Sequence, residues 1–169
     1  MRPPIAQMTK KEILWLHNHR CNHGHTFLSH YSCYLKEKSI KEKVGFLDIE
    51  TSNLKANFGI VFSWCIKPAG SMKIQSSVIT RKELASPTGD KRLIRDCIEA
   101  MNKYDRIVGH FGCYFDIPYL RTRAIMHKLH FPRYGDIVYT DTWKMAKRTL
   151  CIHSNRQNTI AEALFGKTI

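Results

Sequence analysis

The chain has 169 residues, with 43% hydrophobic, 24% charged and 11% aromatic side chains, the balance of an ordinary globular protein. No apolar run approaches the roughly 20 residues that span a bilayer, and no hydrophobic segment follows the first residues, so we predict a cytoplasmic protein with neither membrane span nor secretion signal. Lys and Arg outnumber Asp and Glu by 27 to 14, a net charge of +13. The expected partner is therefore a polyanion such as nucleic acid.

The first 43 residues are predicted to form a small unit of their own. A helix is expected to start at Thr9, a good N-cap with Glu12 three residues later, and to run toward Arg20. Residues 17–33 then hold five histidines and two cysteines and show neither helical nor strand periodicity. A segment with this composition needs something other than a hydrophobic core to order it.

The thiol and imidazole groups of this segment suggest that a metal ion orders it. Cys21, His25, His30 and Cys33 form a Cys₂His₂ set suited to tetrahedral zinc, with His23 as a substitute for His25. Zinc would order a piece too small to have a core. The alternative is a polar basic loop whose histidines lie near phosphate groups.

An α/β domain with a mixed five-stranded sheet is predicted for residues 44–169. Residues 44–49 are apolar on both faces up to the acidic residue, as in a central strand covered on both sides. Two further strands, joined by a Pro-Ala-Gly turn, predict an antiparallel meander. The expected strands are 44–49, 58–66, 72–80, 106–110 and 137–140, and the expected helices are 90–101 (capped by Asp90), one after Asp116, 141–148 and 157–165.

Two acidic residues end the most apolar strand. Asp48 and Glu50 are separated by one residue, so both carboxylates project from the same face. Ionised carboxylates this close repel each other and lose hydration unless a cation compensates them. Mg²⁺ or Mn²⁺ suits such oxygen ligands. The alternative is that Asp48 starts a turn and Glu50 is solvated.

A third acid strengthens the cation hypothesis. Asp116 follows the strand at 106–110 and begins a helix, where its ordinary role is that of an N-cap. If the strands at 44–49 and 106–110 are parallel neighbours, their carboxyl ends bring Asp116 beside Asp48 and Glu50. Three acids in a basic protein suit two-metal phosphodiester cleavage.

Two stretches carry a family resemblance. Gly45-Phe46-Leu47-Asp48-Ile49-Glu50-Thr51 resembles the first motif of the DEDD-type 3′–5′ exonucleases of the ribonuclease-H-like superfamily. Ile107-Val108-Gly109-His110 with Tyr114-Phe115-Asp116-Ile117-Pro118-Tyr119-Leu120 resembles the second motif. Asp141-Thr142-Trp143 and the stretch from Asn158 to Gly166 resemble the segments that usually follow, so the likeness covers residues 44–169.

The resemblance implies a ribonuclease-H-like sheet flanked by helices, two Mg²⁺ or Mn²⁺ ions, and hydrolysis of DNA or RNA from a single-stranded 3′ end. Asp48 would bridge both ions, Glu50 would hold the ion on the side of the nucleophile, and Asp116 would act mainly through coordinated water. Thr51 and Leu54 are expected to lie against the terminal nucleotide.

His110 is expected to contact the substrate as well, and the residues around it depart from the family. Phe111 stands where many members have asparagine. A fourth aspartate, preceded by Tyr or His, should follow a further helix, and Asp136 and Asp141 come too early in the order, as a loop residue and a helix cap. We therefore expect a piece of a longer protein that binds metal poorly and cuts weakly or not at all.

Three functions remain open at this point. The first is a metal-dependent 3′–5′ exonuclease preceded by a zinc module that grips nucleic acid. The second is a non-catalytic nucleic-acid-binding module with the same fold. The third is a basic scaffold that binds an acidic protein surface.

Overall fold

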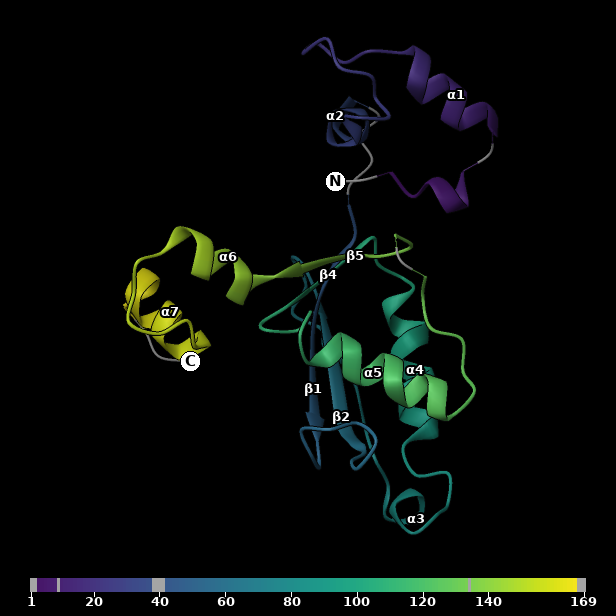
Figure 1. Ribbon diagram of the computed structural model, residues 1–169, viewed down its shortest axis with the longest axis vertical. Coiled ribbons are helices and arrows are strands. Elements are labelled where there is room, and N and C mark those ends of the chain that lie inside the picture. Colours follow the sequence, from purple (N-terminus) through teal and green to yellow (C-terminus); the bar gives the residue numbers. More distant parts are fainter. Residues whose placement is uncertain (1–2, 9, 38–41, 134, 167–169) are drawn as a thin grey trace.

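The computed structural model describes residues 3–8, 10–37, 42–133 and 135–166, and the predicted cap Thr9 lies outside them (Figure 1). The strands are β1 (Val44–Thr51), β2 (Val61–Pro68), β3 (Gln75–Val78), β4 (Arg106–Gly109) and β5 (Val138–Asp141). The helices are the short 3₁₀ turn η1 (Ile5–Gln7), α1 (Lys10–Asn18), α2 (Tyr31–Glu37), α3 (Arg81–Leu84), α4 (Lys91–Met101), α5 (Asp116–Met126), α6 (Thr142–Thr149) and α7 (Gln157–Phe165). Helix α2 was not predicted from the sequence.

The five strands form one mixed sheet in the order β3-β2-β1-β4-β5. β1 pairs antiparallel with β2, and β2 pairs antiparallel with β3, which is the predicted meander. β4 runs parallel to both β1 and β5. The predicted mixed five-stranded α/β sheet is confirmed and is consistent with a ribonuclease-H-like fold.

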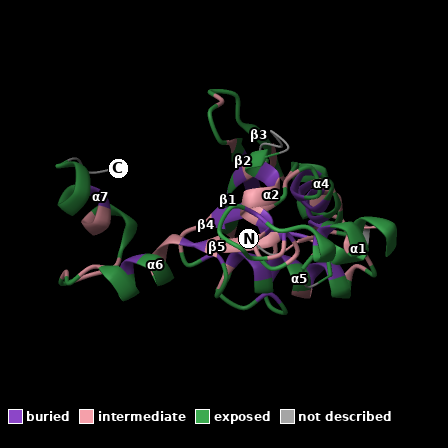
Figure 2. Ribbon diagram, turned by 90° about the horizontal axis from the view of Figure 1, so that it is seen from above, coloured by how far each residue is buried: buried purple, intermediate pink, exposed green. Residues whose placement is uncertain are grey.

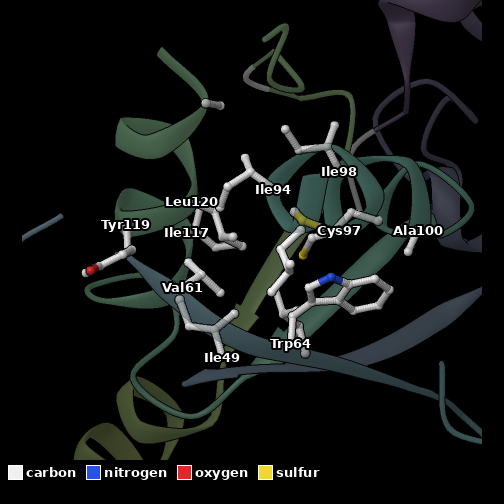
Figure 3. Packing of buried hydrophobic residues seen from close by; sticks show 14 of the residues in the cluster. Ile49, Val61, Trp64, Ile94, Cys97, Ile98, Ala100, Ile117, Tyr119 and Leu120 are labelled. Carbon is white, nitrogen blue, oxygen red and sulfur yellow. The ribbon is translucent and has the colours of Figure 1, made fainter. Parts of the chain in front are cut away.

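Helices α4 and α5 cover one face of this sheet (Figure 2). Their apolar residues pack with Ile49, Val61 and Trp64 in the main hydrophobic core, part of which is drawn in Figure 3. The opposite face of β1 is not covered by the described residues, since Phe46, Asp48 and Glu50 are exposed. The expectation that β1 is covered on both sides was therefore wrong, because burial along it alternates with the pleat.

A buried ionic network fastens this core. Asp90 does not cap α4 as predicted; its carboxylate is fully buried and accepts a hydrogen bond from the N–H of Val61 at 2.7 Å. Arg123 on α5 donates to it from Nε and Nη2, and His127 Nε2 lies 2.7 Å away. Burial alone would raise the pKa of Asp90, but the hydrogen bonds from Arg123, Val61 and His127 hold it below its usual value.

A second, smaller cluster lies near the amino terminus. Leu16, Cys21, Phe27, Tyr31 and Leu35 are buried together, and we call residues 10–37 the N-terminal module. The chain then enters β1, the first strand of the sheet (Figure 1). Among the described residues, no helix is both long and apolar enough to cross a bilayer.

Candidate functional site

The pleat of β1 presents two carboxylates on one surface. Asp48 and Glu50 are both exposed, whereas Leu47 and Ile49 between and beside them are buried in the core. Partial desolvation, followed by the nearby charge of Glu50, raises the pKa of Asp48. The pair therefore carries an electrostatic cost that a bound cation would relieve.

The third acid, Asp116, contacts β1 from the first turn of α5. β1 pairs with β4 only as far as Phe46, so the backbone of β1 beyond this residue does not pair with β4. The Oδ1 atom of Asp116 accepts a hydrogen bond from the N–H of Ile49 at 3.2 Å. Burial, followed by the charge of Asp48, raises the pKa of Asp116 to about 6. We call Asp48, Glu50 and Asp116 the carboxylate site.

Two glycines make this approach possible. A Cβ atom on Gly109 would lie 3.3 Å from the Cα of Gly112, and one on Gly112 would lie 3.2 Å from the Cα of Gly109. A side chain at either position would push apart the end of β4 and the turn that leads into α5. The pocket beneath this turn is lined by Leu47, Cys113 and Asp116, among others.

The three carboxylates do not close into a tight ligand cage. Among the residues that the structure describes, ligand atoms from three or more side chains gather within 4.8 Å of one another at Cys21, His23, His30 and Cys33. Mg²⁺ and Mn²⁺ prefer carboxylate oxygens and keep several bound waters, but two oxygens bound directly to one ion lie within about 4.2 Å of each other. The carboxylate site thus has the donor chemistry for hard cations but not a complete first coordination sphere.

The Cys/His cluster, made of Cys21, His23, His30 and Cys33, has the geometry of a tetrahedral site. The distance from Cys21 Sγ to His30 Nδ1 is 3.3 Å, and that from Cys21 Sγ to His23 Nδ1 is 3.7 Å. Cys33 Sγ lies 3.4 Å from His23 Nδ1 and 3.5 Å from His30 Nδ1. A zinc tetrahedron with ordinary Zn–S and Zn–N bonds has S···N edges of about 3.6 Å. The cluster could therefore hold a metal ion.

The fourth ligand position differs from the first choice made from the sequence. His25 was predicted there with His23 as its substitute, and the structure places His23 in the cluster. The cause is a tight turn in which Gly24, at φ +80°, donates its N–H to the carbonyl of Cys21. The carbonyl of His25 accepts from the N–H of Cys21, and its ring packs edge-on against His30.

The residues predicted to contact substrate follow the strands β1 and β4 in the chain. Thr51 ends β1, and its hydroxyl donates to the carbonyl of Asn53. Leu54 follows on the loop to β2 and is 79% exposed. His110 follows β4, with Nδ1 2.9 Å from the hydroxyl oxygen of Thr142.

Asp141 has a larger role than the sequence indicated. It caps α6 as predicted, accepting from the N–H groups of Trp143 and Lys144. Its carboxylate also accepts from the N–H groups of Phe111 and Cys113, each at 3.0 Å. This second pair of bonds, which no local motif signals, holds the turn before Asp116. The loop prediction for Asp136 is confirmed by its contact with the N–H of Arg133.

Comparison with known proteins gives a likeness of fold. No protein-family model matches the chain, and no curated protein matches it. The structure is similar to that of the family B DNA polymerase from the hyperthermophilic archaeon Pyrobaculum calidifontis, with a TM-score of 0.63 and 19% sequence identity. The match covers 76% of this chain and 19% of the polymerase chain, so the protein corresponds in fold to about one fifth of that enzyme.

Proposed function

We propose that the chain contains a metal-dependent 3′–5′ exonuclease domain of the DEDD type that hydrolyses DNA or RNA from a single-stranded 3′ end. The observation that carries the proposal is the approach of Asp116 to β1, where its carboxylate accepts the N–H of Ile49 and experiences the charge of Asp48. Two acids of β1 and the first residue of α5, the helix that follows the parallel strand β4, thus lie close together in a basic protein. The fold likeness to a DNA polymerase supports the same reading.

The proposed roles follow the family resemblance. Asp48 would hold both Mg²⁺ or Mn²⁺ ions, Glu50 would hold the ion on the side of the attacking water, and Asp116 would act through coordinated water. Two ions placed in this way activate the nucleophile and stabilise the leaving oxygen. Thr51 and Leu54 lie against the terminal nucleotide, and His110 is a further substrate contact.

The test is a cleavage assay. A short 5′-labelled single strand incubated with Mn²⁺ should shorten stepwise from its 3′ end, and Asp48→Asn should abolish the shortening. Asp136→Asn is the matched control, because this aspartate accepts the N–H of Arg133 in a loop and is not one of the three acids of the carboxylate site. A circular strand of the same sequence should stay intact. Shortening that persists in Asp48→Asn would contradict the mechanism.

A second candidate is a non-catalytic nucleic-acid-binding module with the same fold. It is favoured by the open spacing of the carboxylates, which do not gather within 4.8 Å as the Cys/His cluster does, and by the net charge of +13. Strand binding that weakens with rising salt but is never followed by cleavage would favour this candidate. Strand binding whose affinity does not change with salt concentration would contradict both candidate functions.

We also propose that zinc occupies the Cys/His cluster and that the chain divides after residue 43 into a zinc module and the exonuclease domain. Two thiolates and two imidazoles at tetrahedral spacing suit zinc better than a hard cation. Metal analysis of protein purified without chelator should find one zinc per chain. Cys33→Ser should lose it, and His25→Asn, the matched control, should keep it.

A further inference from the structure

Three aromatic side chains gather on the surface beside the carboxylate site. Phe111 and Tyr114 stack with ring centroids 5.1 Å apart, and Trp143 meets both rings edge-on, at 5.1 Å and 5.7 Å. Phe111 is 42% exposed and Tyr114 is 52% exposed, whereas Trp143 is half-buried. We call these three residues the aromatic surface. The three rings lie outside the main core and form a contiguous apolar patch that is partly open to solvent.

The aromatic surface is held rigidly. One oxygen of Asp141, Oδ1, accepts the N–H of Phe111 and also that of Trp143, each at 3.0 Å, so a single buried carboxylate fixes both backbones. Phe111 adopts a left-handed backbone conformation with φ +64°, which costs free energy for a bulky residue. The exposed ring of Phe111 is thus held by a locally strained backbone.

The surroundings of the aromatic surface are cationic. The Nζ atom of Lys147 lies 4.9 Å from the centroid of the Trp143 ring. Lys144 and Arg148 on the same helix are also exposed, and α6 contains no acidic residue. Rigid rings beside positive charges are the means by which proteins bind single strands, where bases stack on aromatic faces and phosphates pair with cations.

The position of this surface relates it to cleavage. Phe111 and Tyr114 belong to the turn between β4 and α5, Asp116 is the first residue of α5, and Gly112 in that turn approaches the carboxylate of Asp116. A strand bound on the rings would therefore pass the carboxylate site. Unpaired bases alone can reach the rings, because bases in a duplex already stack on one another.

We propose that Phe111, Tyr114 and Trp143 form a stacking surface for unpaired bases of a nucleic-acid strand, and that α6 supplies the cations for its phosphates. This inference rests on the proposed function and adds the determinant of single-strand preference. It predicts recognition through the bases themselves, in addition to attraction between phosphates and the net positive charge.

The experiment compares two labelled strands of equal length by fluorescence anisotropy, without added Mg²⁺ or Mn²⁺ and without chelator. One strand carries bases and the other is abasic, so their phosphate charges match. Phe111→Gly removes a ring while allowing the positive φ. It should weaken binding of the normal strand roughly tenfold and leave the abasic strand unchanged. Phe165→Ala, at an exposed phenylalanine of α7, should leave both unchanged.

The outcomes separate this inference from the proposed function. An equal loss on both strands, or no loss on either, would overturn the stacking surface, even if the wild-type protein still cuts in Mn²⁺. Base-dependent binding by a wild type that does not cut would support the stacking surface and contradict the nuclease. A melting temperature of Phe111→Gly close to that of the wild type would exclude misfolding as the cause of a selective loss.

Discussion

The two ends of this molecule are stabilised by different means. Eighteen buried hydrophobic residues of the described chain form the core that joins the sheet to α4 and α5, whereas five form that of the N-terminal module. A core of five residues is too small to offset the loss of chain entropy on folding. The module instead has four metal-type ligands within 4.8 Å of one another. The comparison teaches that the sheet region is held by burial, whereas the module needs the proposed metal ion to make up for its small core. Each region should therefore be open to separate disruption.

Metal removal should have the largest effect and should act on the module alone. Structural zinc sites contribute on the order of 10 kcal/mol or more to folding. We therefore expect a chelator to unfold residues 10–37 while α4, α5 and the sheet persist. Hydrogen exchange measures this directly, as full exchange in α1 and α2 beside retained protection in β1 and β2. Retained protection in α1 after the metal is gone would show that the module does not need it.

The substitution Arg123→Met should destabilise the sheet region and leave the N-terminal module intact. Asp90 is fully buried, and this substitution removes its charged hydrogen-bond partner, so we expect a loss of about 3 to 5 kcal/mol in the free energy of unfolding. Urea denaturation followed by tryptophan fluorescence measures the loss. Arg95→Met, at an exposed arginine paired with Asp96, is the control and should cost less than about 1 kcal/mol. Metal content should be unchanged in both variants.

Asp116→Asn should stabilise the sheet region above neutral pH. The folded-state pKa of Asp116 is about 6, above its ordinary value of 3.8, so the stability that its proton confers is present below pH 4 and lost as pH rises through 6. Removing the charge should therefore raise the free energy of unfolding at pH 8 by about 2 to 3 kcal/mol in the absence of divalent ions.

Thermal denaturation of wild type and Asp116→Asn at several pH values checks this sign. The two melting temperatures should converge at pH 4, where the wild-type carboxyl group is protonated. Addition of Mn²⁺ at pH 8 should stabilise the wild type more than the variant, because the ion compensates the charges of the carboxylate site. A variant that is less stable than wild type at pH 8 would contradict the electrostatic account.

The smallest effect comes from two matched glycines. Gly24 in the module and Gly70 between β2 and β3 both have a positive φ, with open space where a Cβ would lie. Alanine at either position therefore costs only backbone strain, about 1 to 2 kcal/mol. Gly24→Ala should lower zinc affinity roughly tenfold in a competition titration. Gly70→Ala should lower the melting temperature of the sheet region and leave zinc affinity unchanged.

Much of the fold follows from short-range patterns in the sequence. The apolar spacing of α4 and the mixed sheet are correct, because hydrophobic periodicity determines which faces can be buried. The open face of β1 was not predictable from its apolar residues, since burial there depends on what the rest of the chain covers. The partner of Asp90 was also missed, because Arg123 lies 33 residues away and nothing local links the two.

The candidate site was predictable to a similar extent. The alternation in β1 puts Asp48 and Glu50 on one face, and the strand order brings Asp116 to them. The choice between His23 and His25 depended on the turn at Gly24, which composition does not specify. The aromatic surface was missed because it joins residues 111 and 143 through the side chain of Asp141.

The side chain of Asp141 also connects two separate elements of the protein. Its carboxylate accepts hydrogen bonds from two N–H groups of the turn before α5 and from two N–H groups of the first turn of α6. Asp141 therefore links the start of α6 to the segment that carries Asp116, together with the contacts of Thr142 and Trp143. A substitution of Asp141 would thus disturb the backbone that positions Asp116, although Asp141 is not one of the three acids of the carboxylate site.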